Sequence, residues 1–388
     1  KELTQLYKDS KLRFDADPSF KERALLAVGR LQRGEQRERA LWEQVCSLSR
    51  DSFNEIYEAL GVQLTERGES FYAAHIPGVI DKLQEAGLVA KDGGALVVPV
   101  PGYEAPLILV KSDTAHGYDT TDLAAAWYRL VECNADRVIY VVDAGQATHL
   151  EMIFAAARLA GWTRGSGERD KVMEHVAFGV VQGEDGKKFK TRSGETVALS
   201  ALLDEANARA KAAILDRAQE SGSHVTPDKL EETARQIGIG AVKYADLRSH
   251  HSTNYKFSFE RMLELKGDTA VYIMYSRVRL ASILRRASAD THHLATTTLP
   301  TFSDPRERAL ALQIVQFPDV VHDVTRELCP RYLCEYLYKL SGRCNDMITH
   351  CQVLGADSEE SRLVLVAAAE RTLSTGLHLL GIAAPDHI

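Results

Sequence analysis

The stretch that decides the fold is VIYVVDAGQATHLEMIFAAARLAGW, which occupies residues 138–162. Its first six residues, Val138–Asp143, are apolar up to a terminal acid, a pattern typical of a buried strand. A helix is predicted over Leu150–Leu159, and the run HVAFGVV predicts a second strand over His175–Val181. A strand, a helix and a strand in this order predict a parallel crossover unit. Because ligands of such sheets bind beyond the carboxyl ends of the strands, we expect functional residues just after each strand.

Helices dominate the rest of the chain. Before the crossover unit, the sequence predicts helices at 40–61 and 80–88, short strands at 95–100 and 107–111, and a helix at 121–133. After residue 196 it predicts helices at 198–220, from 226 and at 271–286, then a loop at 299–305 and three more helices. The expected fold class is therefore α/β plus all-α, with an α/β domain joined to an all-α bundle in the C-terminal third.

Composition and charge exclude several classes of protein. The 388 residues include 47 Lys and Arg against 54 Asp and Glu, a net charge of −7, which excludes a uniformly basic nucleic-acid coat but not a local basic patch. No uncharged apolar run reaches the roughly 18–20 residues that crossing a bilayer needs, so no membrane partner is expected. The six cysteines form no CxxC pair, which favours reduced thiols over a metal site and indicates a reducing compartment.

Two polar groups flank the first strand of the crossover unit. The motif YDTTD, Tyr118–Asp122, stands at a predicted helix start, where the Asp122 carboxylate either caps the helix or meets a guanidinium or ammonium group of a ligand. The motif DAGQATH, residues 143–149, directly follows the strand. Its Gln146 and His149 either line a site or hydrogen-bond to the helix that follows.

A basic loop follows the second strand. It reads GEDGKKFKTRSG over Gly183–Gly194 and places Lys187, Lys188, Lys190 and Arg192 among glycines. Clustered cations on such a backbone suit a polyphosphate, and the alternative is a solvated basic hairpin. The loop is not a P-loop, because no GxxxxGK[ST] motif occurs.

A row of arginines lies on the helix predicted at 271–286. Arg277 and Arg279 follow Tyr272 and Tyr275 within the same helix. A solvated helix face is the usual explanation of such a row. The alternative is RNA contact, since aromatic rings stack on unpaired bases while arginines meet phosphates.

In this order, the segments together resemble the arginyl-tRNA synthetases. The matching stretches are FDADPSFKERA (14–24), LWEQVCSLSRDSFNEIYEALGV (41–62), ERGESFY (66–72), GYDTTDLAAAWYRL (117–130), residues 138–162, HVAFGVVQGEDGKKFKTRSGET (175–196) and AVYIMYSRVR (270–279). The resemblance covers essentially the whole chain. It implies a partial Rossmann-like class I catalytic domain with a helical insertion, followed by an α-helical anticodon-binding bundle.

The resemblance also implies a reaction and its partners. Residues 1–105 would be the insertion part, 106–240 the C-terminal half of the catalytic domain, and 241–388 the helical stem and anticodon-binding domain. ATP, accompanied by Mg²⁺, would activate L-arginine to arginyl-adenylate, from which arginine passes to tRNA-Arg. A cytoplasmic monomer without metal-ligating side chains is expected.

Site residues follow from the same resemblance. The arginine pocket would use Tyr118, Asp122 and Gln146, with Asp122 paired to the substrate guanidinium. The ATP site would use His149, Phe178, Gly179, Val180, Lys188 and Lys190. The catalytic cations would be Lys188, Lys190 and Arg192, and the tRNA contacts Tyr272, Tyr275, Arg277 and Arg279.

The chain departs from the family pattern in three places, one of which is SDTAHGYDTTD, residues 112–122, in place of the usual SDGG-type approach to the arginine motif. The family's KMSKS motif is replaced here by KFKTR, residues 188–192, which leaves open whether Lys190 or Arg192 acts on the departing pyrophosphate. No HIGH-like tetrapeptide occurs, and the family places that motif before residue 1 of this sequence. We therefore expect a fragment that is inactive by itself. The alternatives are a non-catalytic tRNA-binding or scaffold fragment, and an unrelated nucleotide-binding α/β protein with a helical domain.

Overall fold

The computed structural model describes residues 2–112, 115–165, 167, 169–183, 186, 198–221, 226–290, 293–294, 296 and 299–386. Contacts divide the chain into two compact units, Lys1–Gln63 and Leu64–Ile388. The predicted fold class, α/β plus all-α, is confirmed within the second unit.

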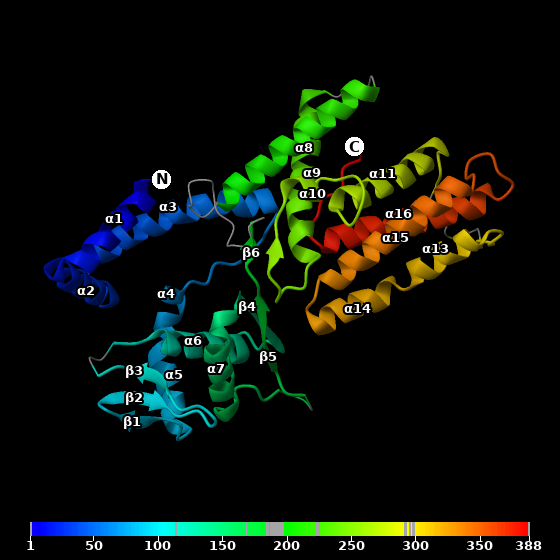
Figure 1. Cartoon of the computed structure of the whole chain (residues 1–388). Helices are drawn as coiled ribbons and strands as arrows, with labels where there is room; N and C mark the ends of the chain where they lie inside the picture. Colours follow the sequence, from blue (N-terminus) through cyan, green and yellow to red (C-terminus); the bar gives the residue numbers. More distant parts are fainter. Residues whose placement is uncertain are drawn as a thin grey trace. The chain divides into compact units, whose positions relative to one another are not determined.

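The first unit consists of three helices, α1 (Glu2–Ala16), α2 (Pro18–Gln32) and α3 (Gln36–Leu60) (Figure 1). α2 begins where Asp17 accepts a hydrogen bond from the Phe20 N–H at 3.1 Å. α3 ends at Gly61, whose φ of 63° is left-handed, as the sequence predicts. None of the described side chains of this unit is buried.

The second unit begins with an α/β part. Its first elements are α4 (Glu69–Tyr72), the 3₁₀ turn η1 (Ala73–His75) and α5 (Ile76–Glu85). They are followed by an antiparallel sheet of β1 (Ala90–Asp92), β2 (Ala95–Val98) and β3 (Leu107–Val110). α6 (Tyr118–Trp127) then continues into the π-helical turn η2 (Tyr128–Glu132).

The predicted crossover unit is confirmed. It consists of β4 (Arg137–Asp143), the 3₁₀ turn η3 (Ala144–Gln146), α7 (Ala147–Leu159) and β5 (Val172–Phe178). β4 and β5 are parallel over their whole length, with Asp143 opposite Phe178. Buried residues of α5, α6 and α7, among them Leu83, Leu123 and Ile153, share one core with β3. That core holds α6 and α7 in place beside strands β3 and β4.

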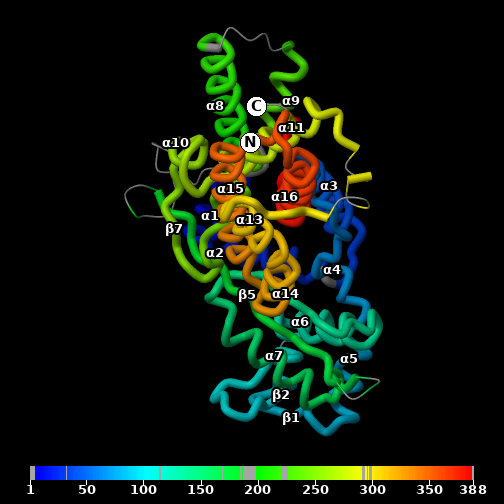
Figure 2. Tube along the Cα trace, turned by 90° about the vertical axis from the view of Figure 1, so that its right-hand side faces the viewer, coloured from blue at the N-terminus to red at the C-terminus, as the bar shows by residue number. Residues whose placement is uncertain are grey.

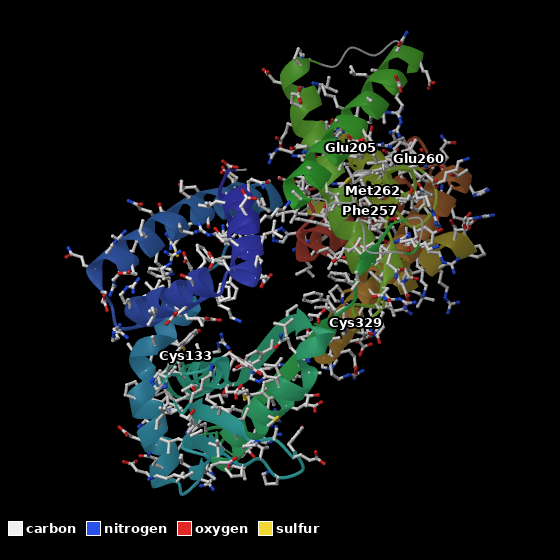
Figure 3. The ribbon with its side chains drawn as sticks, turned by 60° about the vertical axis from the view of Figure 1, so that its left-hand side comes forward. Cys133, Glu205, Phe257, Glu260, Met262 and Cys329 are labelled. Atoms are coloured by element: carbon white, nitrogen blue, oxygen red, sulfur yellow. The ribbon has the colours of Figure 1, made fainter. Side chains whose placement is uncertain are left out.

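A short parallel pair joins the α/β part to the helices that follow. β6 (Val181–Gln182) pairs with β7 (Tyr255–Lys256), which follows α8 (Leu199–Ser221) and α9 (Pro227–Leu247). Phe257 lies just before α10 (Phe259–Met262), and Met262 is its last residue. Both are labelled in Figure 3 and share a small core with Ala206 and Ala241.

The remaining helices form a bundle: α11 (Ala270–Arg286), α13 (Pro305–Val315), α14 (Phe317–Glu327), α15 (Arg331–His350) and α16 (Glu359–Leu379). α11, α13, α15 and α16 pack around a shared core (Figures 1 and 2). The prediction of three helices after residue 305 was wrong, because four are present. Pro318 has no backbone N–H and lies in the first turn of α14, so the chain breaks after Val315 and starts a new helix.

Candidate functional site

The carboxyl ends of β4 and β5 form the edge where the sequence predicts chemistry. Because Asp143 lies opposite Phe178, the residues after each strand emerge side by side. Asp143 Oδ1 accepts a hydrogen bond from the Gly145 N–H at 2.8 Å and so holds the turn into α7. Gln146, at the start of α7, is exposed at this edge.

The start of α6 is anchored to β3 by two side chains. Buried Asp119 accepts a hydrogen bond from the Ile108 N–H through Oδ2 at 2.7 Å. Thr120, fully buried, donates its hydroxyl to the Leu109 carbonyl at 2.5 Å. These bonds fix the first turn of α6 against the sheet.

Asp122 is not a helix cap. Gly117 occupies the N-cap position of α6, and Asp122 lies within the helix, four residues after its first residue, Tyr118. At that spacing, Tyr118 and Asp122 share one face of α6. The cap alternative for Asp122 is therefore wrong, and its carboxylate is available to another partner.

That partner, in the structure, is His149 on α7. His149 Nε2 lies 2.7 Å from Asp122 Oδ2, and the Tyr118 ring packs on the imidazole with centroids 4.6 Å apart. His149 is 12% exposed, whereas Asp122 is 39% exposed. The structure thus brings together three predicted site residues, with Gln146 one helical turn before His149.

The chain after β5 is bound by a polar segment that the sequence analysis did not assign to the site. The Gly179 N–H donates to the His251 carbonyl and the Val180 N–H to Asn254 Oδ1, each at 2.7 Å. His251 Nδ1 also lies 2.7 Å from the Ala177 carbonyl oxygen. The run of polar residues at 250–254, between α9 and β7, is the signal that could have indicated this contact.

Gly179 fits here only because it has no side chain. A Cβ at this position would lie 2.5 Å from the Thr253 carbonyl carbon and oxygen and 2.9 Å from the Asn254 nitrogen. We expect Gly179→Ala to lower the free energy of unfolding by about 1–3 kcal/mol, because backbone rather than a flexible side chain must move. Urea denaturation measures this loss. Gly78→Ala is the control, since nothing lies within 4 Å of a Cβ there, and equal stability of the two variants would contradict the prediction.

The predicted catalytic cations Lys188, Lys190 and Arg192 lie outside the described residues. Among the described residues, no group of three or more His, Cys, Asp or Glu side chains could hold a metal ion. Across the same residues, no helix has both the length and the apolar character to cross a membrane. All six cysteines are free thiols.

The four predicted tRNA contacts lie on α11, and two of them are engaged inside the bundle. Arg277 Nε lies 2.7 Å from Glu370 Oε1, and its side chain is 16% exposed. Tyr272 accepts a hydrogen bond from Asn345 Nδ2 at 3.1 Å. Neither interpretation of the arginine row, RNA contact or a solvated helix face, predicted these contacts within the bundle.

Of the other two predicted tRNA contacts, Arg279 is half-buried and Tyr275 is exposed. Arg279 donates to Asn345 Oδ1 at 2.8 Å, and its guanidinium carbon lies 5.8 Å from the centre of the Tyr275 ring. Tyr275 is 40% exposed. Of the four residues, Tyr275 therefore presents the ring most accessible to a base.

Comparison with known proteins decides the family. A family model described as the catalytic domain of class I tRNA synthetases (R) matches residues 1–259, and a model of the DALR anticodon binding domain matches residues 273–388. The chain belongs to the arginyl-tRNA synthetase family. The resemblance read from the sequence motifs is thus confirmed.

Similar proteins support this membership. Arginine–tRNA ligases are 44% identical in Arabidopsis thaliana (cytoplasmic form) and 44% identical in Synechococcus elongatus, each over 98% of this chain and over 64% and 66% of their own lengths. The crystal structure of the arginyl-tRNA synthetase of Plasmodium falciparum superposes with a TM-score of 0.83 at 30% identity, over 100% of this chain and 63% of that one. The chain spans less than two thirds of the length of the two Arabidopsis relatives, at 64% and 59%.

Proposed function

We propose that this chain supplies the arginine pocket and the anticodon-binding bundle of an arginine–tRNA ligase. In the first step, a carboxylate oxygen of arginine attacks the α-phosphorus of ATP, giving arginyl-adenylate and pyrophosphate. In the second, the ribose hydroxyl at the 3′ end of tRNA-Arg takes the arginyl group and AMP leaves. The observation that carries the proposal is the meeting of Tyr118, Asp122 and His149 at the sheet edge.

Within this proposal, the residues at the carboxyl ends of β4 and β5 bind arginine and ATP. The Asp122 carboxylate pairs with the substrate guanidinium, and exposed Tyr118 and Gln146 complete the pocket. The backbone of Phe178, Gly179 and Val180, held by the segment at 250–254, receives ATP. Lys188, Lys190 and Arg192 would stabilise the charge of the pyrophosphate.

The proposal includes Mg²⁺ as a companion of ATP. The described residues offer no cage of three carboxylates or imidazoles for such an ion. Mg²⁺ in comparable sites is held largely by substrate phosphates and water. We therefore assign the ion to the phosphates of the nucleotide.

We further propose that the 388 residues do not complete the reaction by themselves, because their sequence contains no HIGH tetrapeptide. The test compares arginylation of tRNA-Arg by this chain and by a full-length ligase that contains it. Arginylation by the longer protein alone is the expected result. Failure of both to arginylate would favour the second candidate, a non-catalytic tRNA-binding or scaffold fragment.

The bundle should bind tRNA even without catalysis. We expect the 388-residue chain to bind tRNA-Arg weakly and in a salt-sensitive way, each arginine–phosphate contact adding about one unit or less to the slope of log K against log salt. Tyr275→Ala should weaken binding by roughly 1–3 kcal/mol through the loss of base stacking. Tyr275 is preferred to Arg277 for this variant, because Arg277 also stabilises the bundle through Glu370.

Fluorescence titration at two salt concentrations measures this binding, with tRNA-Arg and a version with a substituted anticodon. Tyr7→Ala is the control, since Tyr7 is exposed but lies on α1 outside the bundle. Equal affinities for the two RNAs would leave only nonspecific charge attraction and contradict anticodon recognition.

We propose that the protein acts as a monomer in the cytoplasm. Six free thiols, four of them buried, suit a reducing compartment. The relatives from Arabidopsis carry names that place one form in the cytoplasm and another in chloroplasts and mitochondria. Fractionation and sedimentation of the native protein test both parts of this proposal.

A further inference from the structure

His149 is clamped between two carboxylates of α6. Its Nε2 lies 2.7 Å from Asp122 Oδ2, and its Nδ1 lies 3.6 Å from Asp119 Oδ1. The side chains of His149 and Asp119 are each 12% exposed, so this part of the cluster is largely shielded from water. Asp122 alone reaches toward solvent.

Only one of the two carboxylate oxygens of Asp119 has a hydrogen-bond partner among the described residues. Oδ2 accepts the Ile108 N–H, whereas Oδ1 is buried and has no hydrogen-bond partner among the described residues. A buried polar atom without a partner is costly, and each such atom calls for an explanation. Oδ1 lies 3.6 Å from His149 Nδ1, just beyond hydrogen-bonding distance.

The three side chains form a chain of contacts that starts at the sheet. β3 fixes Asp119, Asp119 faces one nitrogen of His149, and the other nitrogen holds Asp122. Ionised carboxylates only accept hydrogen bonds, so His149 Nε2 is the donor to Asp122. The Tyr118 ring packs on the imidazole and limits its rotation.

We propose that Asp119 and His149 are positioning residues that aim the Asp122 carboxylate at the guanidinium of arginine. Here the inference rests on the proposed function, since it presumes that arginine is the ligand of Asp122. With Oδ2 held by His149, Oδ1 of Asp122 is the oxygen left for the substrate. His149 thus fixes the orientation of the Asp122 carboxylate and leaves Oδ1 free to accept from the guanidinium.

This assignment moves His149 from the ATP site to the arginine pocket, and the two roles predict different kinetics. In a full-length ligase that contains this chain, we expect Asp119→Asn and His149→Ala to raise the KM for arginine about 10- to 100-fold, the range for residues that orient a ligating group. The KM for ATP should change less than about threefold. His149→Gln keeps an N–H donor and should restore part of the arginine affinity.

Three comparisons keep the outcomes distinct. A raised KM for ATP with an unchanged KM for arginine would overturn the proposal and return His149 to the ATP site. If Asp122→Asn impairs arginine use but Asp119→Asn does not, the positioning chain is wrong and the proposed pocket stands. If Asp122→Asn also leaves arginine use unchanged, the proposed pocket itself fails. Asp136→Asn, an exposed carboxylate before β4, is the matched control.

NMR of the 388-residue chain tests the contacts of His149 with Asp119 and Asp122 and does not depend on enzymatic activity. The ¹⁵N resonances of the His149 ring are identified by their loss in His149→Gln. We expect Asp119→Asn to move the Nδ1 resonance and Asp122→Asn the Nε2 resonance. Unmoved His149 resonances in both variants would overturn the proposal even if the variants fold.

Discussion

Replacing Asp122 by alanine in a full-length ligase that contains this chain is expected, if the proposed arginine pocket is correct, to reduce arginine affinity more than a hundredfold while ATP binding changes little. Asp122 is 39% exposed in the free protein, and bound arginine would shield its pair with the guanidinium from water. Removing one partner of a charge pair shielded in this way costs about 3–5 kcal/mol, and 1.4 kcal/mol corresponds to a factor of about ten. Asp122 lies within α6 and is not its cap, so the helix itself should survive the change. ATP–pyrophosphate exchange at varied arginine and ATP concentrations measures the two affinities separately.

Two variants control for a general loss of structure at this position. Asp122→Asn keeps the size of the side chain and removes its charge, so it should lose affinity to a similar degree. Asp143→Asn removes a carboxylate from the same sheet edge, but one that bonds to the backbone of its own turn. An arginine KM that stays within twofold in the Asp122 variants would show that the carboxylate does not bind the substrate.

The sequence predicts the frame of this site well. An apolar strand, a helix and a second apolar strand leave a parallel pair as the simplest arrangement, and β4 and β5 adopt it. From that topology alone, Gln146 and His149 are expected near Phe178, because carboxyl ends of parallel strands share an edge. Periodicity identifies the apolar face of each element, and the core then fixes the rest.

Contacts between polar side chains of different elements could not be predicted in this way. His149 and Asp122 are 27 residues apart, and periodicity does not say which polar groups of α6 and α7 meet. In the sequence, Asp119 resembles any acidic residue in the first turn of a helix, where its negative charge would interact favourably with the helix dipole. Only the fold shows that it is bound to β3 and buried.

The same limit applies to the arginine row. Arg277 reads as a surface cation by its spacing, yet its partner Glu370 lies 93 residues later on another helix. Once α11 and α16 pack, that pair becomes largely buried. Sequence spacing therefore located a charged face but not the partners that occupy it.

Replacing Glu307 by alanine is expected to lower the stability of the helical bundle by about 3–5 kcal/mol, because it leaves the charge of Arg362 without its partner. The Glu307 side chain is 0% exposed, and its Oε1 accepts a hydrogen bond from Arg362 Nε–H at 2.6 Å. Its other oxygen accepts the N–H groups of Ser303 at 2.7 Å and Asp304 at 3.1 Å, which caps α13. Hydrogen exchange of amides in α13 and α16 measures the loss.

The stability contributed by Glu307 should also depend on pH. Burial pushes the pKa of Glu307 up, but the Arg362 guanidinium and the N–H groups of Asp304 and Ser303 outweigh burial and hold this pKa below its ordinary value. A carboxyl whose pKa is lower in the folded state stabilises the fold above its unfolded pKa, which is about 4.3 for glutamate. That contribution is lost as the pH falls through the folded pKa. The stability difference between the wild type and Glu307→Gln should therefore be full at pH 7 and shrink below about pH 4.

An exposed ion pair of the same bundle provides the matched control. Glu335 lies 2.6 Å from Arg331, but these side chains are 40% and 45% exposed. Solvent screening limits such pairs to roughly 0.2–1 kcal/mol, so Glu335→Ala should leave the exchange of α13 and α16 amides nearly unchanged. If Glu307→Ala destabilised the bundle no more than Glu335→Ala, burial would not be what makes the Glu307–Arg362 pair matter. The stability of the bundle would then come from its apolar core, and the hydrogen bonds from Ser303 and Asp304 to Glu307 would contribute little to it.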